Sequence, residues 1–161
     1  KNFPIKISLV ISNNKNAYGI NYAKNNKIKF KIINSKKMIN FENKTLIILK
    51  KNNIKLICLA GFMKVLSDKF IKDFKYKILN IHPSLLPKYK GLNTHKRVLK
   101  NKEKFSGCTV HYVTNKLDSG RVILQKKVRI IKADNEKTLR KKILKIEHLL
   151  YPKAIKLALK N

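Results

Sequence analysis

Two short apolar segments separated by a helix-like stretch constrain the fold of this chain most. Residues 56–60 (LICLA) form an uninterrupted apolar run, which is typical of a strand covered on both faces of a parallel sheet. Residues 78–81 predict a second buried strand. Between them, Ser67 predicts the N-cap of a helix over residues 68–74, with Asp68 in its first turn. A strand, a helix and a strand in this order favour a right-handed βαβ unit, so we expect an α/β fold.

Strand-like and helix-like segments alternate through most of the 161 residues, a length that suits one domain. Residues 5–12 and 29–33 predict strands, and residues 17–25 and 42–53 predict helices. Residues 94–101 predict a helix capped by Thr94, and a long amphipathic helix is expected from residue 136 onward, kinked or split by Pro152. Residues 109–113 and 122–130 predict an antiparallel pair. The expected fold is a mostly parallel twisted sheet with helices on both faces and an antiparallel extension near the C-terminal third.

A polar motif follows the strand predicted at residues 78–81. Asn80 and His82 lie two residues apart, so their side chains point to the same side of an extended strand. Pro83 disfavours helical geometry at His82 and cannot continue a ladder of hydrogen bonds. An amide and an imidazole therefore project together from a strand end, as at the edge of an active site.

Two further loops are expected beside this motif, because α/β sheets bind ligands beyond the carboxyl ends of their strands. The loop at residues 61–63 would supply an apolar wall, and the loop at residues 117–120 would supply Asp118. An Asp beside a His orients the ring and favours its charged form, and an amide beside an imidazolium can stabilise an oxyanion. The set suits acyl-type transfer through a tetrahedral intermediate. Spacing alone also allows Asp118 as an ordinary turn residue and His82 as an ordinary loop residue.

The net charge of +31 has two interpretations. It could serve binding to nucleic acid or another polyanion. However, the lysines are spread along the whole chain among many Asn and Ile residues, as an AT-rich coding sequence produces, and Arg is scarce. We expect a solvated basic surface and no nucleic-acid partner.

The cysteines and the apolar runs indicate the compartment. Cys58 and Cys108 lie in apolar or small-residue segments without the spacing of metal ligands, which predicts buried free thiols and no metal. No apolar run approaches the roughly 20 residues of a membrane span, and no secretory signal is recognisable. We expect a cytoplasmic protein without a membrane partner.

Four motifs resemble the phosphoribosylglycinamide formyltransferases: residues 59–63 (LAGFM), 80–89 (NIHPSLLPKY), 91–95 (GLNTH) and 117–120 (LDSG). Their order and spacing match from about residue 10 to residue 152. Pro83 and residues 91–95 favour this family over the related methionyl-tRNA formyltransferases and formyltetrahydrofolate deformylases. The resemblance implies one Rossmann-like formyltransferase domain over residues 1–161. It also implies transfer of a formyl group from 10-formyltetrahydrofolate to phosphoribosylglycinamide in purine synthesis, without a metal.

The resemblance also implies roles for individual residues. Asn80 would hydrogen-bond the formyl oxygen, His82 would be the general acid, and Asp118 would hold and charge His82. Pro83 and Glu147 would contact the ribonucleotide. The folate site would be lined by Met63, Lys64, Val65 and Leu66, together with Asn80 and the loop of Thr114, Asn115, Lys116, Leu117 and Asp118. His95, His111 and His148 also fall at positions where the family often has His. His111 would be a structural residue, and His95 would support the site without being catalytic.

The start of the sequence departs from the family pattern. The family opens with a strand and a Gly-rich loop that binds the substrate phosphate at a helix N-terminus, whereas residues 1–12 already align with its second strand. We expect the first strand and this loop to be missing, through either a fragment boundary or a real loss. A deformylase and a weakened folate- or polyanion-binding module are the alternative functions, and the protein could be a monomer or a homodimer.

Overall fold

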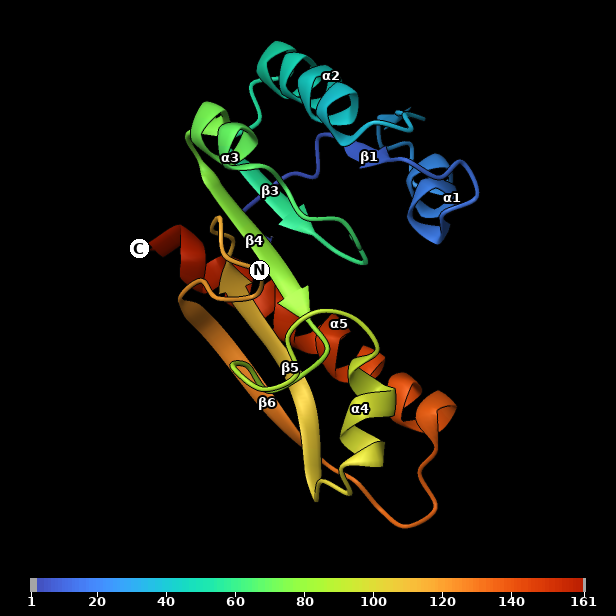
Figure 1. Ribbon diagram of the computed structural model, residues 1–161. Coiled ribbons are helices and arrows are strands. Elements are labelled where there is room, and N and C mark those ends of the chain that lie inside the picture. Colours follow the sequence, from blue (N-terminus) through green and yellow to red (C-terminus); the bar gives the residue numbers. More distant parts are fainter. Residues whose placement is uncertain (1–2, 161) are drawn as a thin grey trace. The chain divides into compact units, whose positions relative to one another are not determined.

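The computed structural model describes residues 3–160, which form two units (Figure 1). The first unit holds the chain up to Lys55 together with Leu66–Lys75. The second holds Leu56–Val65 and the chain from Tyr76 onward. Within residues 3–160, no helix is both long enough and apolar enough to cross a membrane.

The first unit contains two parallel strands and three helices. Val10 pairs with Phe30 and Ser12 with Ile32, so the two strands and the helix between them form a βαβ unit. Ile20 of that helix is fully buried. In chain order the elements are β1 (Val10–Ser12), α1 (Tyr18–Asn25), β2 (Phe30–Ile32), α2 (Met38–Lys51) and α3 (Asp68–Phe74).

A buried carboxylate links two helices of the first unit. Glu42 of α2 is only 2% exposed. Its two oxygens accept hydrogen bonds from the backbone N–H of Ser67 at 2.6 Å and from the Ser67 hydroxyl at 2.7 Å. The same hydroxyl accepts from the N–H of Phe70 at 3.1 Å and so caps α3. The predicted cap at Ser67 is confirmed, and the buried charge of Glu42 is compensated by two donors.

The second unit is built on a four-stranded sheet of order β3-β4-β5-β6 (Figure 1). The first two strands are parallel, and the other two pairs are antiparallel. The elements are β3 (Leu56–Leu59), β4 (Lys77–His82), α4 (Thr94–Lys100), β5 (Phe105–Tyr112), β6 (Val122–Arg129) and α5 (Glu136–Lys160). The antiparallel extension is confirmed, and β5 begins four residues earlier than predicted.

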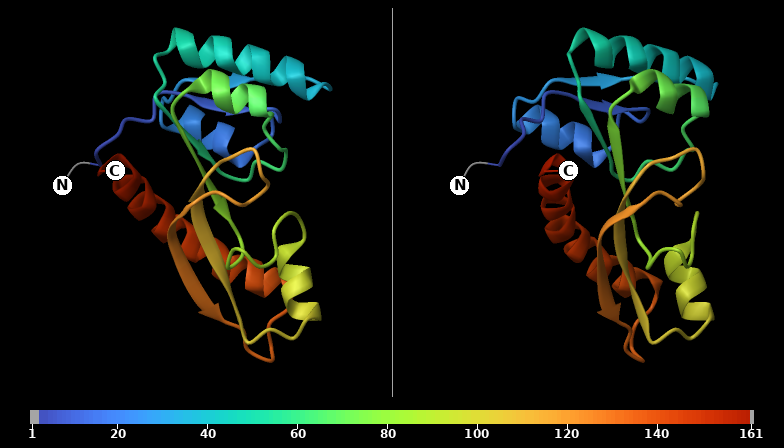
Figure 2. Two further views of the ribbon diagram at one scale, coloured as in Figure 1. Left: turned by 60° about the vertical axis from the view of Figure 1, so that its left-hand side comes forward. Right: turned by 90° about the vertical axis from the view of Figure 1, so that its left-hand side faces the viewer.

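The core of the second unit lies between the sheet and α5. In Figure 2 the red helix α5 runs along the yellow β5 and the orange β6. Leu139 and Ile143 of α5 are 0% and 1% exposed. These apolar side chains form one cluster with Val98 of α4 and with Cys108 and Val110 of β5. Burial of such side chains is worth about 1.5–3 kcal/mol each, so α5 is a main stabiliser of the strands that carry the site.

The mixed α/β class is confirmed, but several predicted strand and helix boundaries are wrong. Residues 5–9 are not in a strand, because the partner β2 offers only Phe30–Ile32 for pairing. Helix α2 begins at Met38, four residues before the predicted start. The helix α4 does begin at Thr94, but its N-cap is Asn93 in the left-handed region, with φ of 56°. The predicted cap at Thr94 is therefore wrong.

Two further predictions about single residues need correction. Pro152 does not split the last helix, because α5 continues from Glu136 to Lys160. Cys108 is buried as expected, whereas Cys58 is exposed. Cys58 lies on β3, an edge strand of the four-stranded sheet within residues 3–160, and side chains of a strand are covered by whatever packs on the faces of the sheet.

Candidate active site

The end of β4 carries the amide and the imidazole that the sequence placed together. Asn80 and His82 share one face of this strand. The antiparallel neighbour β5 sets His111 opposite Asn80, and Thr109 opposite His82. The Asn80 Nδ2 atom lies 3.3 Å from Nε2 of His111. The strand pairing thus gathers one amide and two imidazole rings.

His82 lies between two acceptors. Its Nδ1 atom is 3.3 Å from Oδ2 of Asp118, and both side chains are 8% exposed. Its Nε2 atom is 2.9 Å from the carbonyl oxygen of Tyr89. A carbonyl can only accept, so Nε2 must carry a proton and donate it to Tyr89. Both ring nitrogens therefore face an acceptor, Nε2 the Tyr89 carbonyl and Nδ1 the Asp118 carboxylate.

Asp118 reaches His82 from a loop that folds back over the sheet. Because β5 is antiparallel to β4, its carboxyl end at Tyr112 lies opposite Leu79 and not beside His82. The following loop returns, and Asp118 adopts a left-handed conformation with φ of 45°. Its Oδ2 atom accepts a hydrogen bond from the N–H of Gly91 at 2.9 Å. This bond and the contact with Nδ1 of His82 fix the carboxylate beside the imidazole.

A glycine allows the Asp118 loop to approach the strand so closely. A Cβ atom on Gly120 would overlap the carbonyl oxygen of Tyr112, which belongs to the backbone. Only glycine fits this approach without a shift of the strand or the loop. Gly120 therefore helps to determine where Asp118 lies.

The loop after His82 is held by buried hydrogen bonds. The Thr109 hydroxyl donates to the carbonyl of Ser84 at 2.7 Å and accepts from the N–H of Leu86 at 3.1 Å. The side-chain amide of Gln125 donates to both Thr109 Oγ1 and the Leu86 carbonyl, at 2.8 and 3.0 Å. The Leu86–Pro87 peptide bond is cis. Thr109 and Gln125 are support residues that the sequence did not indicate.

The Tyr89 carbonyl that faces His82 is also fixed in place. The Tyr89 hydroxyl donates to Glu103 at 2.9 Å and accepts from the side-chain amide of Asn101 at 3.0 Å. The guanidinium of Arg97 lies 5.4 Å from the Tyr89 ring centre, a cation–π distance. The hydroxyl of Tyr89 lowers the pKa of Glu103, and Lys88 adds to the effect. These contacts orient the peptide that accepts from His82.

The structure brings Asn80, His82 and Asp118 together, and the other predicted site residues differ in their exposure. Pro83 follows His82 and is partly exposed. Glu147 is half-buried on α5, where burial raises its pKa and Arg140 opposes that rise. Leu66 is buried within the first unit. The exposed members of the predicted folate site are Met63, Lys64, Val65, Thr114, Asn115, Lys116 and Leu117.

His111 is nearly inaccessible and makes contacts of its own. It is 2% exposed, and its Nδ1 atom lies 2.8 Å from the carbonyl oxygen of Tyr112. Its Nε2 atom faces Asn80 and is 3.7 Å from Oδ1 of Asp118.

His95 contributes a buried Nδ1 atom for which no hydrogen-bond partner is found within residues 3–160. In that part of the chain no cluster of three or more His, Cys, Asp or Glu residues could hold a metal.

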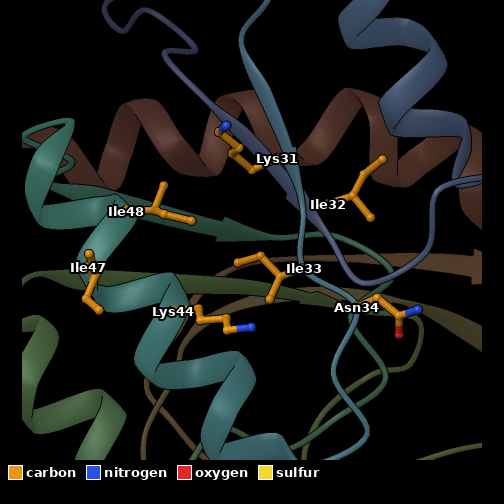
Figure 3. A pocket seen from close by; sticks show the side chains of 7 residues that line it. All are labelled: Lys31, Ile32, Ile33, Asn34, Lys44, Ile47 and Ile48. Atoms are coloured by element: carbon orange, nitrogen blue, oxygen red, sulfur yellow. The ribbon is translucent and has the colours of Figure 1, made fainter.

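Two hollows are lined by other residues. One of about 370 Å³ belongs to the first unit, where β2 and the segment after it face α2 (Figure 3). Its walls are Lys31, Ile32, Ile33, Asn34, Lys44, Ile47 and Ile48. The other, of about 350 Å³, is lined in the second unit by residues that include Leu85, Glu103 and Lys127. Neither includes Asn80, His82 or Asp118.

Comparison with known proteins identifies the family. The family described as formyl transferase matches residues 1–155. The chain belongs to this family. A phosphoribosylglycinamide formyltransferase from Haemophilus influenzae is 41% identical over 159 residues, which are 95% of this chain and 74% of that protein. The resemblance seen in the motifs is thereby confirmed.

Relatives and solved structures of this family carry related names. The human trifunctional purine biosynthetic protein adenosine-3 is 37% identical over 159 residues, 97% of this chain but 16% of the human protein. The crystal structure of phosphoribosylglycinamide formyltransferase from Anaplasma phagocytophilum matches with a TM-score of 0.88 at 41% identity, covering 94% of this chain and 73% of that one. This chain therefore spans about a sixth of the human relative and about three quarters of these two bacterial formyltransferases.

Proposed function

We propose that this chain transfers the formyl group of 10-formyltetrahydrofolate to the amine of 5'-phosphoribosylglycinamide. The observation that carries the proposal is the placement of the His82 ring between Asp118 and the Tyr89 carbonyl, on the strand face that also presents Asn80. The names of the relatives support the choice of substrates. A hydrolase acting on the same folate has no comparable support.

The proposed reaction begins when the substrate amine attacks the formyl carbon. A carbon–nitrogen bond forms, and the formyl oxygen gains negative charge. An N–H of Asn80 and the charged ring of His82 would stabilise this oxyanion. Donors of this kind typically contribute about 10²–10³ in rate, because their charge is oriented before the reaction begins.

Collapse of the intermediate needs a proton on the leaving nitrogen of the folate. A proton of the His82 ring, which lies between Asp118 and the Tyr89 carbonyl, would supply it. The bond from the formyl carbon to the folate nitrogen then breaks. The excess proton of the attacking amine would return to His82 through a water held by Asp118, so that the enzyme ends in its starting state.

The remaining parts of the proposal concern binding. Met63, Lys64, Val65, Leu66 and the 114–118 loop would contact the folate. Pro83 and Glu147 would contact the ribonucleotide. The single domain, the cytoplasmic location and the oligomeric state stay predictions.

The test is an incubation of the protein with 10-formyltetrahydrofolate in the presence and absence of phosphoribosylglycinamide. The proposal expects folate turnover only when the amine is present, with formylated amine as product. Turnover that does not need the amine would instead indicate a hydrolase. Tight folate binding without turnover would indicate a binding module.

A further inference from the structure

His111 occupies the position opposite Asn80 on the neighbouring strand and lies within 4 Å of two site residues. The mechanism above gives it no task. Its ring is 2% exposed, so it cannot serve merely as a solvated surface group. Its contacts determine what it does.

The hydrogen bond at Nδ1 determines the tautomer of the ring. Nδ1 lies 2.8 Å from the Tyr112 carbonyl oxygen, which can only accept, so Nδ1 carries a proton. Burial lowers the pKa of His111. The hydrogen bond to Tyr112 and the charge of Asp118 raise this pKa, whereas the charge of His82 lowers it further. The net result is a pKa below the ordinary value of a histidine. The ring is therefore neutral near pH 7, and Nε2 carries a lone pair.

The lone pair at Nε2 determines the orientation of the Asn80 amide. Nε2 can only accept, so the group that faces it at 3.3 Å must be the NH₂ of Asn80. One N–H of that NH₂ is bound to His111 and the other stays available. The opposite amide orientation would set the carbonyl oxygen against a lone pair. A surface asparagine has no such constraint and can present either end.

We propose that His111 is a positioning residue that holds the Asn80 amide with its second N–H directed toward the formyl oxygen of the substrate. The inference rests on the proposed function for its consequence, but the hydrogen-bond arrangement is a property of the protein alone. The competing arrangement is a doubly protonated His111 that donates to Asp118 and faces a flipped Asn80. Burial of the ring, the charge of His82 and the 3.7 Å separation from Asp118 oppose it.

The first experiment reads the tautomer directly and needs no activity. Long-range ¹H–¹⁵N spectra of the unmodified protein at pH 7, with His111 assigned by its substitution, distinguish the three ring states. The inference expects a neutral ring with the proton on Nδ1. A proton on Nε2, alone or together with Nδ1, would overturn it.

The second experiment compares kcat and KM for His111→Leu and His111→Gln. Leucine removes the acceptor, whereas the glutamine oxygen can take the place of Nε2. We expect kcat to fall about tenfold or more in the leucine variant, with KM for both substrates within about threefold, and the glutamine variant to recover most of the rate. The exposed His148, replaced by Gln, serves as the matched control and should not change either constant.

The outcomes separate the inference from the proposed function. If the unmodified protein transfers formyl groups and the folded leucine variant matches its kcat, the positioning role is wrong while the function stands. If the unmodified protein transfers none, the proposed function fails, and the tautomer spectrum still decides the hydrogen-bond arrangement. A leucine variant that fails to fold leaves the decision to that spectrum.

Discussion

Replacing Thr109 by valine tests whether buried hydrogen bonds hold the loop that follows His82. Valine has nearly the shape of threonine, so the change creates no large cavity, and its effect comes from the lost hydroxyl. The Leu86 N–H then loses an acceptor and the Ser84 carbonyl loses a donor, and both residues are buried. The exposed Gln125 loses its bond to Thr109 Oγ1 but keeps its bond to the Leu86 carbonyl.

The magnitude follows from the two groups left without a partner. Each unsatisfied buried polar group costs about 1–3 kcal/mol, and a carbonyl tolerates this better than an N–H. We expect the free energy of unfolding to fall by about 2–4 kcal/mol. The matched control is Thr45→Val in α2, whose hydroxyl donates only to the carbonyl of Phe41, a group inside the same helix. That control should cost less than about 1 kcal/mol.

The assay is urea unfolding of the unmodified protein and both variants, with amide hydrogen exchange at Leu86 to locate the change. Comparable slopes would show that the variants unfold the same surface. Equal losses in Thr109→Val and Thr45→Val, together with unchanged protection at Leu86, would refute the reasoning.

Three further substitutions test separate parts of the account. Asp118→Asn keeps the shape of the side chain but removes the charge beside His82. We expect kcat to fall about 100-fold or more, while the free energy of unfolding changes by less than about 1 kcal/mol. A kcat close to that of the unmodified protein would reject this role. Glu42→Gln places an amide NH₂ against the two donors of Ser67. Urea unfolding should show that the free energy of unfolding falls by about 1.5–3 kcal/mol. An unchanged free energy of unfolding would mean that the carboxylate is not needed. Gly120→Ala forces a methyl group onto the Tyr112 carbonyl and should lower the melting temperature measurably, in contrast to Gly19→Ala, where open space surrounds the added atom.

Local signals in the sequence predicted the parts of the fold that depend on neighbouring residues. Ser67 precedes a helix and caps it, because its hydroxyl needs only the N–H three residues on. Asn80 and His82 share a face because every strand alternates sides. The parallel pairing of β3 with β4 followed from apolar runs separated by a helix.

The position of Asp118 was predicted correctly for an incomplete reason. The rule that carboxyl strand ends gather at one edge holds for parallel strands, whereas β5 is antiparallel to β4. Asp118 reaches His82 only because its loop turns back, with Gly120 against Tyr112. Neither the strand direction nor the path of the loop has a local sequence signal, because both depend on pairing across the sheet.

The sequence could not indicate the backbone groups of the site. The Tyr89 carbonyl bonds His82 and the Gly91 N–H bonds Asp118, but almost every residue carries such groups. The left-handed Asn93 was a detectable signal, because Asn is among the residues that tolerate this conformation. The exposure of Cys58 depends on what covers the faces of β3, which a single apolar run does not reveal.

The most direct measurement of the central claim is the rate of formyl transfer from 10-formyltetrahydrofolate to phosphoribosylglycinamide by the unmodified protein and by His82→Ala. The account predicts transfer that depends on the amine and falls by at least about 100-fold in the folded variant, because the variant lacks the ring that faces Asp118 and donates the proton. An unchanged rate in His82→Ala, or release of formate without the amine, would contradict it.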